Sequence, residues 1–195
     1  MAAPRIGVFG GTFDPIHVGH LAAAVEVRHV LALDRVLLVV SNNPWQKAGS
    51  RPITPAEDRY AVVAAAAADL EGLEPSRIEI DRGGDSYTAD TLAELAVRHR
   101  GAELFLVVGA DLAAALGTWA RGEEIRGLAT LAVVTRPGPD RSAVPAGWEG
   151  VTVAVPSIDV SSTDLRARVA EGRPIDVLVP PAAVRCIRER GLYAG

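Results

Sequence analysis

Two histidines, His17 and His20, stand in a short segment between a strand-like run and a helix-like run. The segment reads GGTFDPIHVGH from Gly10; it follows the apolar residues 6–9 and precedes an alanine-rich stretch. Because the histidines are three positions apart at the start of a predicted helix, both imidazoles should project from one face of its first turn. Gly10 and Gly11 allow the backbone to approach a ligand closely, and the N–H groups of a helix N-terminus attract anions. The pattern predicts a cradle for a polyphosphate, with two imidazole donors aimed at one phosphorus.

Other glycine-rich phosphate sites fit the sequence less well. The dinucleotide fingerprint G-x-G-x-x-G is absent, and the second predicted strand runs into Ser41-Asn42-Asn43 instead of an acidic residue. A P-loop requires Gly-Lys-Ser/Thr, but the first lysine of the chain is Lys47. A pair of glycines can also be a plain turn, and a single histidine can be a surface or core residue. The ordered combination of glycines and histidines favours the phosphate site.

Composition limits the classes of partner. The chain has 195 residues, of which 49% are hydrophobic and 23% charged, and 20 basic against 24 acidic residues give a net charge of −4. Nucleic acid is therefore not an expected partner, because no general basic surface is available. The single cysteine, Cys186, excludes an internal disulfide and has no activating motif around it, so we expect it to pack; no thiol or histidine cluster predicts a structural zinc site.

The sequence shows no membrane-spanning or signal segment. The longest apolar run, Ala61–Ala68, is far shorter than the ~20 residues that a membrane helix needs. The first ten residues, MAAPRIGVFG, lack the pattern of a signal peptide. We therefore expect a soluble cytoplasmic protein with no membrane partner. A homo-oligomer is possible on this sequence, which does not specify an oligomeric state.

Short apolar runs alternate with helical patterns along the chain. We expect strands near residues 6–9, 36–40, 77–80, 104–108, 131–135 and 151–155, and helices near residues 17–33, 54–68, 88–99, 162–171 and 181–190, with a broken helical stretch over 111–126. Strands that are continuously apolar are typical of parallel sheets covered on both faces. The alternation therefore predicts an α/β fold with a doubly wound, mainly parallel, Rossmann-like sheet.

We expect one domain over residues 1–195, whose part from about residue 158 onward is helical. Thr54-Pro55-Ala56-Glu57 has the form of a capping box with proline at the first helical position. Residues 136–150 are rich in proline and glycine, which predicts a surface loop. Ligands of such folds bind at the carboxyl ends of the strands, and the histidine motif lies at that end of the first strand.

Two motifs carry a resemblance to a known family. GGTFDPIHVGH resembles the T/HxGH signature of the nucleotidyltransferase superfamily, and residues 160–166, VSSTDLR, resemble its ISSTxIR motif. The chain is most similar to the bacterial nicotinate-mononucleotide adenylyltransferases. That similarity rests on the full GTFDPIH order, the SYTADTL segment from Ser86, Gly109-Ala110-Asp111, Trp119, residues 135–138 (TRPG) and residues 191–193 (GLY).

The resemblance implies adenylyl transfer from ATP to nicotinate mononucleotide, giving nicotinate adenine dinucleotide and pyrophosphate. It implies Mg²⁺ as a companion of ATP and no permanent metal site. His17 and His20 would be the catalytic donors to the α-phosphate, and Asp111 would lie on the ribose or adenosine side. The residues implied for ATP binding are Gly10, Gly11, Thr12, His17, His20, Gly109, Asp111, Ser162, Thr163 and Arg166.

A second set of residues is implied for the mononucleotide. It comprises Asn43, Lys47, Ser86, Tyr87, Thr88, Trp119 and Arg136. The indole of Trp119 would stack on the cationic pyridinium ring, and N–H groups at Tyr87 and Thr88 would receive the carboxylate.

Plainer roles remain open for several of these residues. The residues alone favour packing for Trp119 and helix capping for Thr88. Asp111 and the Ser161–Thr163 run could also be helix caps, and Arg136 could be a solvated loop arginine.

One segment departs from the family pattern, which usually reads Asn-Pro-Pro-His-Lys after the second strand. Here the segment reads Asn43-Pro44-Trp45-Gln46-Lys47. We hypothesise that Trp45 makes this loop bulky enough to fold over the nucleotide site; a surface or subunit-contact position is the alternative. Asp14 is interpreted as a residue that braces its own loop.

Two other functions remain possible. One is nucleotidyl transfer to another acceptor, such as phosphopantetheine. The second is a non-catalytic nucleotide-binding regulator on the same fold, although such a regulator would not need both histidines. An oxidoreductase is disfavoured because the dinucleotide fingerprint is missing.

Overall fold

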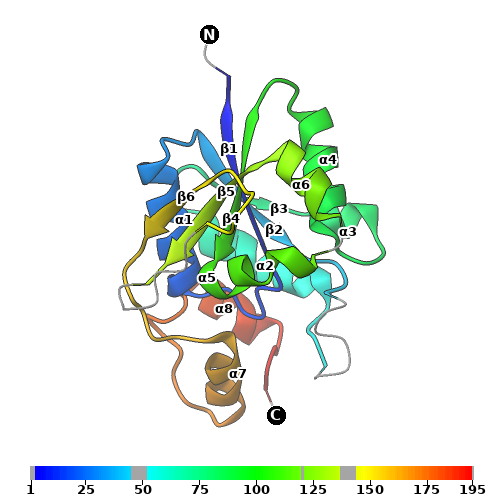
Figure 1. Ribbon diagram of the computed structural model, residues 1–195. Coiled ribbons are helices and arrows are strands. Elements are labelled where there is room, and N and C mark those ends of the chain that lie inside the picture. The colour runs from blue at the N-terminus through cyan, green and yellow to red at the C-terminus, as the bar shows by residue number, and fades with distance from the viewer. Residues whose placement is uncertain (1–2, 45–51, 120, 137–143, 195) are drawn as a thin grey trace.

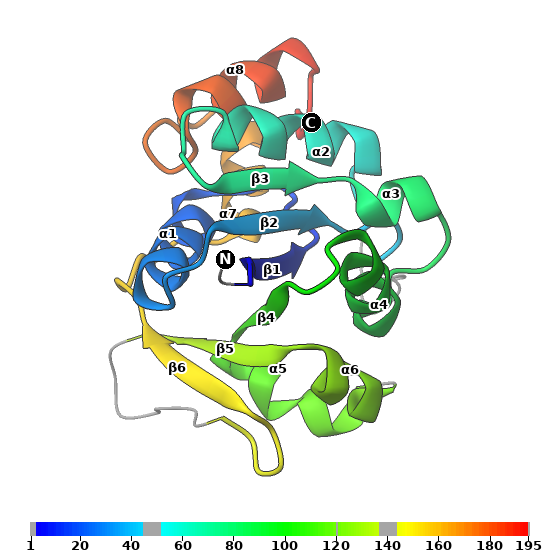
Figure 2. The ribbon, with the colours of Figure 1, turned by 90° about the horizontal axis from the view of Figure 1, so that it is seen from above.

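A computed structural model describes residues 3–44, 52–119, 121–136 and 144–194 of the chain (Figure 1). Its centre is one six-stranded sheet in which every neighbouring pair is parallel, in the order β3-β2-β1-β4-β5-β6 (Figure 2). The strands are β1 (Arg5–Gly11), β2 (Arg35–Val40), β3 (Leu73–Ser76), β4 (Glu103–Gly109), β5 (Thr130–Thr135) and β6 (Gly150–Ala154). The predicted doubly wound α/β fold is therefore confirmed.

Helices cover both faces of the sheet. They are α1 (Val18–Val30), α2 (Ala56–Ala67), α3 (Ile78–Arg82), α4 (Thr88–Arg98), α5 (Ala110–Ala114), the 3₁₀ turn η2 (Leu116–Thr118), α6 (Gly122–Leu128), α7 (Ser162–Ala170) and α8 (Pro181–Glu189). Figure 2 shows α1 on one side of the sheet and α3, α4, α5 and α6 on the other, with α8 lying along α2. Among the described residues, no helix is long and apolar enough to span a bilayer.

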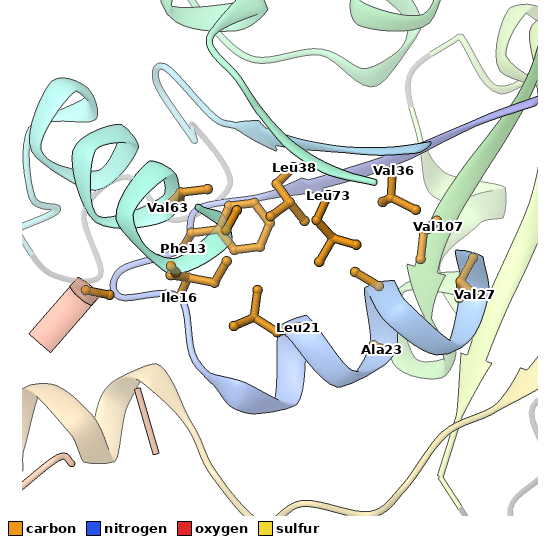
Figure 3. Close-up of a cluster of buried hydrophobic side chains, with 14 of the residues drawn as sticks. Phe13, Ile16, Leu21, Ala23, Val27, Val36, Leu38, Val63, Leu73 and Val107 are labelled. Carbon is orange, nitrogen blue, oxygen red and sulfur yellow. The ribbon is translucent and has the colours of Figure 1, made fainter. Parts of the chain in front are cut away.

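Two hydrophobic cores explain why the strand sequences are continuously apolar. In β2, Val36, Leu38 and Val40 face the core shared with α1, α2 and α8, whereas Leu37 and Val39 face the core shared with α4, α5 and α6. Figure 3 shows the first core, where Leu21 and Ala23 of α1 approach the sheet. A strand buried on both faces needs an apolar residue at every position.

The chain winds outward from β1 in both directions. It passes from β1 to β2 and β3, then returns to the other side of β1 to form β4, β5 and β6. The strand order therefore reverses between β1 and β4, and the carboxyl ends of these two strands open a crevice there. Gly10 and Gly11 end β1, and Gly109 ends β4. The histidine motif begins at this crevice.

The strand expected at residues 77–80 is wrong. Residues 78–82 form the short helix α3, and the strand lies upstream, where Leu73 pairs with Val36 of β2. The alternation of Ile78 and Ile80 with polar residues resembles a strand, but a run this short fits one helical turn equally well. β3 contains Pro75, which is tolerated because β3 is an edge strand.

The capping box expected at residues 54–57 is also wrong. Pro55 is the N-cap of α2, which has no side-chain cap, so the proline precedes the first helical residue. The Thr54 carbonyl instead accepts a hydrogen bond from Arg59 Nε at 2.8 Å. By contrast, Ser161 does cap α7, because its Oγ accepts from the Asp164 N–H at 3.1 Å.

Candidate active site

A cavity of about 270 Å³ lies at the crevice between β1 and β4. It brings together residues from both predicted binding sets. The predicted residues that line it are Gly10, Gly11, Thr12, Gly109, Ser86, Tyr87, Thr88 and Trp119. The first four belong to the set expected for ATP, and the last four to the set expected for the mononucleotide. One cavity thus joins the two halves of the proposed site.

His17 and His20 stack on each other at the start of α1. Their ring centroids are 3.7 Å apart with an interplanar angle of 28°. His20 Nδ1 accepts from the His17 backbone N–H at 3.3 Å, and the Phe13 ring meets the His20 ring edge-on at 5.2 Å. The two rings therefore lie together, as their spacing predicts, although His17 is the extended N-cap residue of α1 and not part of its first turn. Phe13 itself adopts φ +47°, an uncommon backbone conformation for a bulky residue, in the turn that leads to the histidines.

His17 is neutral in the folded chain near neutral pH. Burial, and to a lesser extent the positive charge of Arg136, lower its pKa from 6.5 to about 4. Its side chain is only 7% exposed, and within the described residues its Nδ1 is buried without a hydrogen-bond partner. A neutral imidazole can donate one hydrogen bond to a phosphate oxygen without carrying a charge of its own.

We expect the low pKa of His17 to make stability depend on pH between about 6.5 and 4. The unfolded chain binds the His17 proton at higher pH than the folded chain, so this contribution is complete above 6.5 and is lost as pH falls toward 4. In urea titrations from pH 7.5 to 4, the unfolding free energy of the wild type should fall more steeply than that of His17→Gln. The difference between the two slopes of unfolding free energy against pH should correspond to the uptake of about one proton on unfolding. Parallel profiles of the two proteins would contradict the assignment.

Residues of α7 and of the C-terminal end bond to the loop between β1 and α1 (residues 12–17), called here the histidine loop. Arg166 Nη1 donates to the Asp14 carbonyl at 2.6 Å, and Ser162 Oγ donates to the Pro15 carbonyl at 2.9 Å. The Tyr193 hydroxyl donates to Asp14 Oδ1 at 3.0 Å. Burial and the Asp14 carboxylate raise the pKa of Tyr193, so it remains a protonated donor. The two family motifs therefore meet at one loop, and the carboxylate of Asp14, a residue only 1% exposed, is held there by the Tyr193 hydroxyl near the C-terminus.

The segment after β2 is joined to the segment before α4. The Asn42 N–H donates to Ser86 Oγ at 2.9 Å, and Asn42 Nδ2 donates to the Gly84 carbonyl at 2.8 Å. Asn43 Nδ2 donates to Asp85 Oδ1 at 2.6 Å. Asn43 and Ser86, which were predicted to bind the same substrate, therefore lie side by side. Lys47 and the Trp45 loop lie outside the described residues.

Several predicted residues combine a plain role with a place at the site. Trp119 is partly buried against the second core and also lines the cavity. The N-cap of α4 is Tyr87, so Thr88 is the first helical residue and the capping role considered for it is wrong. Asp111, by contrast, does not line the cavity; it is exposed in the first turn of α5, and because the N-cap of α5 is Gly109, the capping role considered for Asp111 is wrong.

The other predicted residues that the structure describes do not line this cavity; they are His17, His20, Asn43, Asp111, Arg136, Ser162, Thr163 and Arg166. Arg136 is exposed at the end of β5, close enough to His17 to lower its pKa. Thr163 Oγ1 accepts from Arg166 Nη2 at 3.3 Å. Cys186 is partly buried and packs against the first core, as expected.

Sequence reasoning missed two buried charged residues. Arg59 of α2 is 1% exposed and donates to backbone carbonyls on both sides of the site. Glu79 lines the cavity at 6% exposed; its Oε1 accepts from the Thr91 hydroxyl at 2.6 Å, while in the described part of the chain its Oε2 is buried without a partner. The only sequence signal for Arg59 is its place at the buried position of an otherwise apolar helical face.

Comparison with known proteins agrees with this geometry. The cytidylyltransferase-like family matches residues 8–168, which extend from β1 into α7. A relative from Corynebacterium kroppenstedtii, named "probable nicotinate-nucleotide adenylyltransferase", is 48% identical over 97% of this chain and 91% of its own length. A relative of the same name from Streptomyces coelicolor is 47% identical over 95% of this chain and 99% of its own.

Solved structures share the fold. The nicotinic acid mononucleotide adenylyltransferase of Plasmodium falciparum, complexed with NaAD, superposes with a TM-score of 0.75 over 97% of both chains at 15% identity. The same enzyme complexed with APC gives a TM-score of 0.74. The chain belongs to the cytidylyltransferase-like family and, within it, to the nicotinate-nucleotide adenylyltransferases.

Proposed function

We propose that the chain transfers the adenylyl group of ATP to nicotinate mononucleotide, forming nicotinate adenine dinucleotide and pyrophosphate in NAD biosynthesis. The observation that carries the proposal is the cavity between β1 and β4, which is lined by four residues of each predicted binding set. The names of the relatives, at 47–48% identity over nearly the whole chain, support the same reaction.

The reaction needs positioning more than a strong base. The 5′-phosphate of the mononucleotide is already anionic near neutral pH, since the second pKa of a phosphomonoester is about 6. One of its oxygens forms a bond to the α-phosphorus of ATP, and the bond from that phosphorus to the bridging oxygen breaks as pyrophosphate leaves. The protein must hold the two phosphates in line and stabilise the charge on the transferred group.

The stacked histidines fit the α-phosphate. His17, neutral near pH 7, would donate one hydrogen bond to an α-phosphate oxygen, and His20 would donate beside it. The backbone at Gly10 and Gly11 would approach the same phosphate, as the absence of Cβ atoms permits.

The ISSTxIR-like motif fits the departing phosphates. Ser162, Thr163 and Arg166 lie in the first half of α7. Ser162 and Arg166 donate to carbonyls of the loop that precedes the histidines, and Thr163 Oγ1 accepts from Arg166. The planar guanidinium of Arg166 suits two oxygens of the β- and γ-phosphates. Asp111 would lie on the adenosine side, beyond Gly109 at the end of β4.

The other side of the cavity fits a cationic pyridine bearing a carboxylate. The Trp119 indole would stack on the ring, and the first N–H groups of α4 at Thr88 would receive the carboxylate. Asn43, Lys47 and Arg136 would hold the phosphate and ribose of the mononucleotide.

Mg²⁺ would enter as part of its complex with ATP. Within the described residues, no group of three or more His, Cys, Asp or Glu could hold a metal ion. The phosphate oxygens of ATP would supply ligands, since Mg²⁺ prefers oxygen donors and keeps several waters. Bound in this way, it would neutralise charge on the triphosphate.

An acceptor panel tests the proposal. Purified protein would be given ATP and Mg²⁺ with nicotinate mononucleotide, nicotinamide mononucleotide or phosphopantetheine, and pyrophosphate release would be measured. We expect the nicotinate form to exceed the amide by about tenfold in kcat/KM, because N–H groups bind a charged carboxylate more strongly than a neutral amide. If only phosphopantetheine supported pyrophosphate release, the chain would be a nucleotidyltransferase for that acceptor instead. If none of the three acceptors supported pyrophosphate release, a regulatory role would be favoured.

A further inference from the structure

We propose that Arg59 is a positioning residue that fixes the distance between the ATP half and the mononucleotide half of the site. The inference rests on the proposed function for its substrates. Arg59 lines no part of the cavity, and it acts through the backbone segments that do.

The guanidinium of Arg59 spans the carboxyl ends of two neighbouring strands. Nη1 donates to the Thr12 carbonyl, just beyond β1, at 2.7 Å. Nη2 donates to the Ser41 and Asn42 carbonyls, just beyond β2, at 2.7 and 3.1 Å. The side chain is 1% exposed, so these bonds are sheltered from water.

These carbonyls belong to the two different halves of the site. Thr12 lies in the glycine-rich turn that we assign to the phosphates, and it lines the cavity. The Ser41–Asn42 peptide faces two ways: its carbonyl accepts from Arg59, and its N–H donates to Ser86 Oγ at 2.9 Å. Because the carbonyl and N–H of a trans peptide point in opposite directions, the bond to Arg59 aims that N–H at Ser86.

The connection continues to the predicted pyridine site. Ser86 N–H donates to the Asn43 carbonyl at 3.1 Å, and α4 begins two residues later at Thr88. Arg59 thus helps to hold the turn after β1 and the segments that lead to α4 at one spacing, together with the Ser41 N–H and Oγ, which donate to the Gly11 carbonyl at 3.0 and 3.1 Å. The donors of a guanidinium lie in one rigid plane, so Arg59 contributes a fixed distance between the Thr12 and Ser41–Asn42 carbonyls.

Loosening this spacing should harm alignment more than binding. Each substrate keeps its direct contacts when Arg59 is changed, so the two KM values should move little. In-line attack is far more sensitive, since a misplacement of about 1 Å can cost on the order of 10²-fold in rate. A ligand that occupies both halves should also lose affinity. When one part of it is bound, the other part is no longer held at the correct distance from its own half of the site.

The test uses Arg59→Lys and Arg59→Met, with Asp58→Asn as the matched control. Lysine keeps the charge without the planar fork, and methionine keeps much of the volume without the donors. Asp58 is the preceding residue of α2, and its side chain pairs with Arg190 at 2.5 Å, away from the cavity. Folding would be checked by circular dichroism and thermal melting, and all rates would be taken well below each melting temperature.

We expect kcat of Arg59→Lys to fall at least tenfold, with both KM values within about threefold of wild type. Titration calorimetry should show the affinity for nicotinate adenine dinucleotide falling at least tenfold, while the affinities for the mononucleotide and a non-hydrolysable ATP analogue stay within about threefold. Arg59→Met should follow the same pattern, and Asp58→Asn should match wild type in every measurement.

Three results would overturn the positioning role. These are a folded Arg59→Lys with wild-type kcat, a rise in one KM without loss of kcat, and failure of both Arg59 variants to fold, which would make Arg59 a residue of general stability. An inactive wild-type protein that also fails to bind the dinucleotide would instead refute the proposed function.

Discussion

Replacing His20 with alanine is expected to lower kcat by on the order of 10²-fold or more, the usual cost of losing one preorganised donor to the transition state. The His20 ring lies between His17 and Phe13 at the entrance to α1. This packing holds the ring in one orientation before substrate arrives, so no reorganisation is needed during the reaction. The measurement is steady-state pyrophosphate release at saturating ATP and mononucleotide.

A second histidine on the same helix supplies the control. His29 is exposed in the last turn of α1, and His29→Ala should keep wild-type turnover. The melting temperature of His20→Ala should be recorded beside its rate, since the ring also packs against Phe13. A folded His20→Ala variant that retains at least a third of wild-type kcat would exclude His20 as a donor to the reacting phosphate.

Replacing Arg166 with alanine is expected to lower kcat/KM for ATP by about 10- to 100-fold, the range for a lost charge-assisted hydrogen bond. Arg166 joins the Asp14 carbonyl to Thr163 Oγ1, so its guanidinium lies between the histidine loop and the start of α7. The N–H groups in the plane of this guanidinium can also donate to phosphate oxygens. Arg166→Lys should recover only part of the loss, because an ammonium group cannot bind two oxygens as a fork.

The control for Arg166 lies two residues further along α7. Arg168 Nε pairs with Asp164 Oδ2 at 2.7 Å within α7, so Arg168→Ala should leave the ATP dependence unchanged. ATP would be varied at saturating mononucleotide for both variants. An Arg166→Ala variant with an unchanged kcat/KM for ATP would remove this residue from the triphosphate site.

Most of the fold follows from local sequence patterns. Five of the six strands lie where apolar runs predict them. In β1, β2, β4 and β5 the run is continuous because these strands are covered on both faces, whereas β6 is a mostly exposed edge strand. β3 has only four residues and a single buried one, Leu73, so its signal is too short to separate from the helical turn that follows. The spacing of His17 and His20 likewise predicts that their rings lie together.

The missed features depend on partners that are distant in the sequence. The capping box is the exception, because its misreading is local: Pro55 takes the N-cap position, and the Thr54 carbonyl is bonded to Arg59 only five residues away. Arg59 reads as one more charged helix residue until the turn after β1 folds onto it. The hydroxyl of Tyr193 reaches Asp14 across 179 positions of sequence, a contact that no local pattern indicates.

That long-range bracing has a consequence for synthesis. A ribosome polymerises all six strands before it adds Ser162, Arg166 and Tyr193, whose bonds secure the loop at Asp14 and Pro15. A nascent chain interrupted after Ala154 would contain all six strands but would lack the bonds to this loop and the side chains that α7 and α8 add to the first core. Both the loop and the core would therefore be completed only by the last translated helices, and prematurely terminated products should be inactive and less stable than the whole chain.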